Sequence, residues 1–85
     1  MNMYELTPKF DNVKSFYGKA RVKMEGETKS LTSYTTQVAV TAGGVARVME
    51  DIQLSATTLR HIKEFLRQEG FQAENQKQIL EDYCR

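Results

Sequence analysis

His61 is the first candidate for chemistry, because it is the only histidine of the chain. A catalytic histidine needs a nucleophile or an orienting carboxylate within hydrogen-bond reach, and no Gly-x-Ser-x-Gly turn supplies one. A zinc site needs three or four protein ligands, whereas the chain offers this histidine and a single cysteine, Cys84. We therefore predict no catalytic residue, no metal site and no cofactor, and we interpret His61 as a residue at the margin of the core.

Two further polar groups have simpler structural explanations. Glu50 and Asp51 are adjacent in an expected strand, so their carboxylates point to opposite faces and do not converge on a substrate. The hydroxyls of Ser55, Thr57 and Thr58 open an expected helix, where the free amides could hold an anion. Capping of the helix explains the same residues, and no glycine-rich phosphate loop precedes them. These patterns predict a protein that is not an enzyme.

Length and charge restrict the protein further. A chain of 85 residues forms one domain with a modest core. The net charge of +1 indicates no general affinity for polyanions. Cys84 has no second cysteine with which to form an intramolecular disulfide. No apolar run is long enough for a membrane span, and no signal peptide opens the chain. We expect a cytoplasmic protein with no membrane partner.

An apolar–polar alternation of period two begins at Ser15 and predicts a strand, "SFYGKARVKM", with basic residues on its odd positions. "TKSLTSYTTQVAVT" and "VARVMEDIQL" predict two more strands, rich in β-branched residues. A three-residue loop around Gly43-Gly44 would set Val38 opposite Val48, so we prefer it to a two-residue loop. The same reasoning favours a three-residue turn at 25–27.

The segment "SATTLRHIKEFLRQEGF" predicts a helix over 55–69. Ser55 suits the N-cap and Gly70 the left-handed position after the last turn. Apolar residues recur along this helix at helical spacing, which gives it one buried stripe.

The predicted fold is therefore α+β: a three-stranded antiparallel meander packed on one main helix, with a short second helix near the C-terminus. The single domain, 1–85, would comprise an irregular N-terminal arm (1–14), a sheet (15–53) and a helical part (55–84).

With the main helix on one face of this sheet, the other face would be basic. We name the predicted binding residues of this face Tyr17, Lys19, Arg21, Lys23 and Arg47. An open sheet with cations and an aromatic residue can hold single-stranded nucleic acid. The alternatives are a solvated face, which antiparallel sheets commonly have, and a surface for self-association, so that both a monomer and a homodimer remain open.

A second basic surface follows the polar face of the helix, where Arg60, Lys63 and Arg67 are candidate contacts for a partner. Glu64 lies four residues after Arg60 and three before Arg67, a spacing that predicts local ion pairs worth a few tenths of a kcal/mol. A mixed run of this kind is typical of a solvated helix face as well as of a contact surface.

Two stretches, "SLTSYTTQVAV" and "SATTLRHIKEFLRQEGF", resemble a family of small uncharacterised proteins from bacteriophages and bacterial mobile elements. Members carry the patterns Ser-Tyr-x-Thr-x-Val-Ala and Ser-Ala-Thr-Thr-x-Arg-His-Ile-x-Glu-Phe, and "KSFYGKARV" is also similar. The matching positions are Ser33, Tyr34, Thr36, Val38, Ala39, Ser55 to Thr58, Arg60 to Ile62, Glu64 and Phe65. The resemblance implies a phage or mobile-element context and brings no activity with it.

Small proteins from that context often inhibit host machinery, CRISPR effectors included. We therefore expect a non-enzymatic binding protein, in the cytoplasm of a bacterial host, that occludes a host protein or nucleoprotein complex. A small nucleic-acid-binding protein that uses the basic sheet face is one alternative. A self-associating structural protein is the other.

Overall fold

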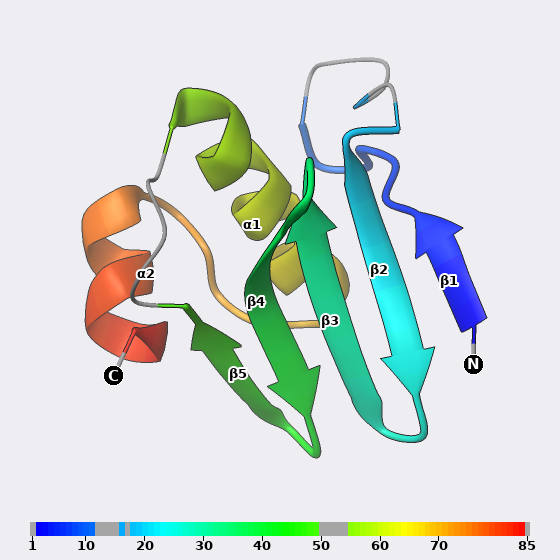
Figure 1. Cartoon of the computed structure of the whole chain (residues 1–85). Helices are drawn as coiled ribbons and strands as arrows, with labels where there is room; N and C mark the ends of the chain where they lie inside the picture. Colours follow the sequence, from blue (N-terminus) through cyan, green and yellow to red (C-terminus); the bar gives the residue numbers. More distant parts are fainter. Residues whose placement is uncertain (1, 12–15, 17, 50–54, 85) are drawn as a thin grey trace.

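The computed structural model describes residues 2–11, 16, 18–49 and 55–84, which form a five-stranded antiparallel sheet and two helices (Figure 1). The strands form a meander in the order β1-β2-β3-β4-β5. The elements are β1 (Asn2–Glu5), β2 (Ala20–Glu25), β3 (Thr28–Ser33), β4 (Thr36–Ala42), β5 (Val45–Val48), α1 (Ala56–Gln68) and α2 (Gln76–Tyr83). The predicted α+β class is confirmed, and the predicted three strands are corrected to five.

The predicted middle strand is two strands, because the chain turns at Tyr34 and Thr35. Ser33 pairs with Thr36 across this turn, and Tyr34 takes a left-handed φ of +58°. The amide N–H of Tyr34 donates to the carbonyl oxygen of Lys19 at 2.6 Å, which ties the turn to the chain before β2. Glycine and asparagine usually mark such a turn, so the tyrosine gives no sequence signal.

The fifth strand, β1, comes from the segment that we expect to be irregular. It pairs antiparallel with β2, so that Tyr4 faces Val22. All four of its residues are exposed, and an edge strand with no buried face lacks the alternation that identifies a strand in sequence. Leu6, which follows directly, is fully buried, and its amide N–H donates to the carbonyl oxygen of Ala20 at 2.9 Å.

Both predicted three-residue turns are two-residue turns in the structure. Glu25 pairs with Thr28, and Ala42 pairs with Val45. Gly43 and Gly44 have φ values of +53° and +83°. Positive φ at both central residues is the requirement of the type I′ hairpin, whose twist matches that of the strands.

A β-bulge in β4 explains why the alternation of apolar residues predicts the wrong pairing of β4 with its neighbours. Leu31 pairs with Ala39, whereas the next residue, Thr32, pairs with Gln37. The residue between, Val38, is therefore extra, and both Val38 and Ala39 are buried. Beyond the bulge the side chains of β4 change faces, so an alignment that assumes strict alternation selects the wrong register.

The helix α1 packs across one face of the sheet, behind β3 and β4 in the view of Figure 1, while α2 lies beside β5. The predicted caps are confirmed: the Ser55 Oγ accepts from the amide N–H of Thr58 at 3.2 Å. At the other end, the N–H of Phe71 donates to the carbonyl oxygen of Leu66 at 2.8 Å around Gly70, as in a Schellman motif.

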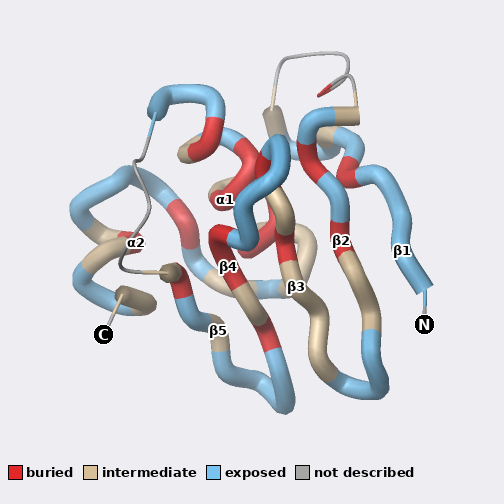
Figure 2. Tube along the Cα trace, in the orientation of Figure 1, coloured by how far each residue is buried: buried red, intermediate tan, exposed pale blue. Residues whose placement is uncertain are grey.

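The core lies between α1 and the central strands, where Figure 2 shows the buried residues concentrated. Its members include Val22, Leu31, Val48, Ile62 and Phe65, each fully buried. Neither of the two helices in the described ranges covers the other face of the sheet (Figure 1). Among the described residues, no helix combines the length and the apolar character that crossing a membrane requires.

Candidate functional site

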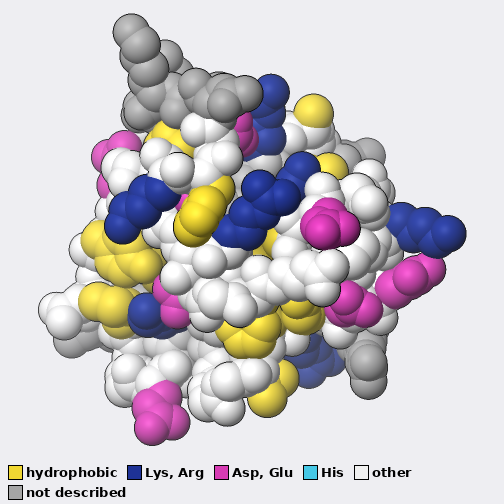
Figure 3. All heavy atoms as spheres, turned by 180° about the vertical axis from the view of Figure 1, so that it is seen from behind, with side chains coloured by type: hydrophobic (Ala, Val, Ile, Leu, Met, Phe, Trp, Pro, Cys, Tyr) yellow, Lys and Arg dark blue, Asp and Glu magenta, His cyan; other side chains and the backbone are white. Residues whose placement is uncertain are grey.

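The outward side of α1 concentrates positive charge. At about 100° per residue, Arg60, Lys63 and Arg67 fall within a sector of about 60° around the helix axis. This sector lies away from the stripe of Ile62 and Phe65 that packs on the sheet. Figure 3 views the molecule from this side and shows Lys and Arg side chains gathered across its upper half.

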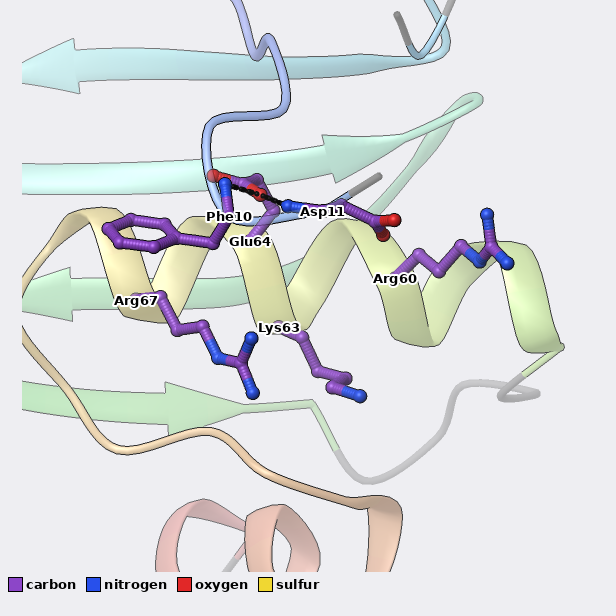
Figure 4. Close-up of a pocket in the computed structure, with 6 residues that line it drawn as sticks. All are labelled: Phe10, Asp11, Arg60, Lys63, Glu64 and Arg67. Carbon is purple, nitrogen blue, oxygen red and sulfur yellow. Dashed lines mark hydrogen bonds between the residues drawn. The ribbon is translucent and has the colours of Figure 1, made fainter. Parts of the chain in front are cut away.

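These three cations line one hollow, which we call the α1 hollow. It encloses about 240 Å³ and is lined by Phe10, Asp11, Arg60, Lys63, Glu64 and Arg67 (Figure 4). The structure therefore brings together all three predicted helix-face residues. It adds Phe10 and Asp11 from the chain after β1, which the sequence analysis does not assign to any site.

Glu64 also lines this hollow, but its carboxylate points toward the segment after β1 and the residue is 2% exposed (Figure 4). Its carboxylate accepts the backbone N–H groups of Lys9, Phe10 and Asp11 at 3.0, 3.0 and 3.2 Å. The Gln68 side-chain amide also donates to it, and donates to the carbonyl oxygen of Thr7 at 2.7 Å. These bonds fasten the segment after β1 along α1.

The predicted ion pairs of Glu64 are therefore wrong. Among the described residues, Glu64 makes no ion pair with Arg60 or Arg67. A carboxylate gains more from several fixed backbone N–H donors in a buried place than from flexible, solvated side chains. The consequence is that the two arginines keep their charge without a local acidic partner on α1.

The donors of the hollow differ in how they are held. Arg67 donates through Nε to the carbonyl oxygen of Ala73 at 2.7 Å, which fixes its guanidinium and leaves the terminal nitrogens available. Within the described part of the chain, Arg60 and Lys63 have neither a hydrogen bond nor an ion pair from their side chains. The hollow thus combines one positioned guanidinium with two uncommitted cations.

The predicted sheet-face residues are dispersed. Arg21, Lys23 and Arg47 do lie on the face away from α1, since their strand neighbours Val22 and Val48 are buried against the helix. Lys23 and Arg47 share one row across four strands, a separation of about 14 Å. These cations therefore do not converge on one group.

Acidic residues also interrupt that face. Lys23 forms an ion pair with Glu25 at 3.0 Å, and Glu5 of β1 lies directly opposite Arg21. Lys19 precedes β2, and its Nζ lies 5.9 Å from the centre of the Tyr34 ring. Tyr17 lies outside the described residues. Neither acid is expected on this face from the sequence, because residues 1–14 are predicted to be irregular and residues 25–27 to form a turn.

His61 is in the core, at 1% exposure, and not at its margin. Its Nδ1 lies 2.8 Å from the Ser33 Oγ, and the Phe16 ring packs edge-on at 4.7 Å. The Nε2 atom has no hydrogen-bond partner among the described residues. Burial lowers the pKa of the His61 imidazole below its ordinary value. The ring is therefore a neutral core group that supports the turn at Tyr34.

A second, more apolar hollow of about 550 Å³ lies between the β4–β5 turn and α2. The rings of Phe71 and Tyr83 meet there edge-to-face, with 6.0 Å between their centroids, and Val45 is 67% exposed at the rim of the hollow.

In the ranges that the structure describes, no group of three or more His, Cys, Asp or Glu side chains is placed to hold a metal ion. Glu50 and Asp51 lie outside these ranges.

A family model matches residues 4–82, a range that runs from β1 to α2. The chain belongs to DUF8033, a family of unknown function. The match begins within β1, includes the segment bonded to Glu64, and ends within α2, so it covers strands β2 to β5, α1 and most of α2. No curated protein and no solved structure matches the chain.

Proposed function

We propose that this DUF8033 protein is a non-enzymatic binding module of phage or mobile-element origin that occludes a host macromolecule. A defence effector of the CRISPR type is the class of target that we favour. The origin and the target class rest on the resemblance of the strand and helix patterns to phage and mobile-element proteins. The contact surface rests on the α1 hollow.

The observation that carries the proposal is the gathering of three cations in one hollow, while Glu64, one of the two acids that line it, bonds to backbone N–H groups. The side chains of Arg60 and Lys63 are unpaired among the described residues, and the Glu64 carboxylate accepts hydrogen bonds from backbone N–H groups. Like charges spaced three and four residues apart destabilise a helix. A protein that keeps such a row, with three cations and two carboxylates lining the hollow, has a surface suited to an anionic partner.

The buried state of His61 supports a role without catalysis. At 1% exposure its imidazole does not reach a bound substrate, and its hydroxyl neighbour Ser33 is 3% exposed. A nucleophile and its base must meet the reacting atom in a cleft. The described residues that line the α1 hollow are cations, carboxylates and one phenylalanine, which together suit binding.

The test is an affinity capture from a bacterial host lysate with three forms of the protein. These are the wild type, the α1 variant R60E/K63E/R67E, and a matched sheet-face variant, K19E/R21E/K23E. Each variant changes three charges, and a circular dichroism spectrum checks that both remain folded. We expect stoichiometric capture of one target by the wild type and the sheet-face variant, insensitive to nuclease. Equal capture by all three forms would overturn the assignment of the contact to α1.

Nucleic-acid binding through the sheet face is the second candidate, favoured by the uncovered face that carries Arg21, Lys23 and Arg47. In that case capture depends on nucleic acid, the affinity falls steeply as salt rises, and K19E/R21E/K23E is the variant that fails to bind.

Self-association is the third candidate, favoured by Met3 and Val45, which are 59% and 67% exposed on the two edge strands. Its signature is a molecular mass by light scattering that rises with concentration.

A further inference from the structure

We infer that the α1 hollow recognises an acidic protein surface: at least two partner carboxylates beside an apolar recess that receives Phe10. This inference rests on the proposed function and specifies the chemistry of the partner. It follows from three properties of the hollow, namely its size, the state of its donors and the exposure of the phenylalanine at its edge.

The size of the hollow suits side chains of a partner. Its volume is about 240 Å³, which is below the ~300–1,000 Å³ that pockets for small molecules usually have. The three cations extend over eight residues of α1, from Arg60 to Arg67, which is about 10 Å along the helix axis. A partner that offers two or more carboxylates over that distance can satisfy all three, whereas a single small anion cannot.

The donors are suited to carboxylates. A guanidinium presents a planar fork that a carboxylate accepts with two parallel hydrogen bonds. Arg67 is already oriented by its bond to the Ala73 carbonyl oxygen, so it loses little freedom on binding. Arg60 is exposed and adds a second fork, and Lys63, between them, adds a point charge.

Phe10 supplies the apolar part of the contact. Its side chain is 57% exposed although its backbone N–H is bonded to the Glu64 carboxylate at 3.0 Å. Both chain neighbours, Lys9 and Asp11, donate to the same carboxylate, so the ring projects from a fixed backbone (Figure 4). A rigid exposed aromatic residue flanked by arginines is the composition that dominates binding energy in protein interfaces.

The charges of the surroundings favour a protein over a nucleic acid. Asp11 and Glu64 place two carboxylates in the hollow beside its three cations. The net charge of the chain is +1, and Glu5 and Glu25 accompany the cations on the open sheet face. Affinity for nucleic acid comes from several phosphate contacts along a basic track. The row of cations in the α1 hollow is short, and carboxylates lie beside it.

The inference is tested with defined probes by NMR, observing the backbone amides of the whole chain. One probe is a short peptide of glutamate and glycine with a central leucine, and the other is an oligothymidylate of comparable length. We expect the peptide to shift the amides of residues 9–11 and 60–67, and R60E/K63E/R67E to weaken this binding at least about tenfold.

One single substitution and one control variant separate the apolar part of the site from its charges. Phe10→Ala should weaken binding of the leucine-containing peptide about threefold or more and leave binding of a leucine-free control peptide unchanged. The variant K19E/R21E/K23E serves as the charge-matched control and should bind as the wild type does. The amide spectra report directly whether each variant is folded.

Several outcomes would overturn the inference: no peptide binding at millimolar concentration, tighter binding of oligothymidylate, or peptide shifts confined to the sheet. Failure of the proposed function is a different result. A target captured through RNA would leave the protein a binding module and reject the acidic protein surface. Peptide binding at the α1 hollow without any captured host target would leave this inference standing and reject the occlusion of a host macromolecule.

Discussion

The two sides of α1 use polar residues in opposite ways. On the side toward the rest of the fold, Glu64 and His61 are 2% and 1% exposed, and the Glu64 carboxylate accepts three backbone N–H groups. On the outward side, Arg60 and Lys63 have no side-chain partner among the described residues. Of the two acids that line the hollow, Glu64 is bonded to backbone N–H groups and not to the cations. A helix in which an acid lies within one turn of two arginines can therefore still present those arginines without an ion pair to that acid.

The largest effect should follow from removing the buried acid. Glu64→Ala leaves three N–H groups without their acceptor, and we expect it to lower the free energy of unfolding by about 2–3 kcal/mol. Glu64→Gln keeps one acceptor oxygen and should cost less. Urea unfolding measures both. If Glu64→Ala and wild type agree within about 0.5 kcal/mol, the inward side of α1 does not have the structural role that we assign to it.

The buried histidine should make stability depend on pH. Its folded-state pKa is lowered by burial from the ordinary 6.5, so the unfolded chain binds a proton that the folded chain excludes. The free energy of unfolding should be complete above about pH 6.5 and fall as the pH decreases below it, by at most about 1.4 kcal/mol per pH unit from this group. Urea unfolding between pH 5 and 8 gives the slope.

His61→Gln is the control for that measurement. It retains a polar side chain that can reach Ser33 but does not titrate, so the slope near pH 6 should become shallower. An unchanged slope in His61→Gln would mean that carboxylates account for the acid sensitivity and that the imidazole is irrelevant to it.

The smallest effect concerns the outward side. Lys63 lies three residues after Arg60 and four before Arg67, so Lys63→Gln removes two repulsive pairs. We expect it to raise the free energy of unfolding by about 0.2–0.5 kcal/mol at low salt, and the gain should diminish at high salt. Thermal unfolding at two salt concentrations measures it.

The matched control for this change is on α2. Lys77 lies four residues before Glu81, a favourable spacing, so Lys77→Gln should lower stability by a similar small amount. A destabilising Lys63→Gln would show that the outward cations are compensated within the chain, and the contrast between the two sides of α1 would disappear.

Local signals in the sequence predict the helices well, because caps and apolar spacing are properties of neighbouring residues. Ser55 and Gly70 bracket α1 as expected, and the α+β class follows from the change of period along the chain. The three helix-face cations are also predictable, since their sector is fixed by helix geometry alone. Helix geometry does not reveal whether nearby acids form ion pairs with these three cations.

The remaining features depend on contacts between distant segments. β1 has no buried face, so only its pairing with β2 identifies it as a strand. Tyr34 turns the chain without a turn-forming residue, and the bulge at Val38 changes the faces of β4. Glu64 is a solvated helix residue by every local criterion, and its burial follows from N–H groups more than fifty residues away.

That separation has a consequence for the order of folding. The hairpins from β2 to β5 close over short loops, whereas the bonds of Glu64 to Lys9, Phe10 and Asp11 close loops of 53 to 55 residues. Contacts of high sequence separation carry the larger loop-closure entropy and form late. We expect the amides of Lys9, Phe10 and Asp11 to gain hydrogen-exchange protection after the hairpins and α1. Docking of the chain's beginning onto α1 is then the step that completes the α1 hollow.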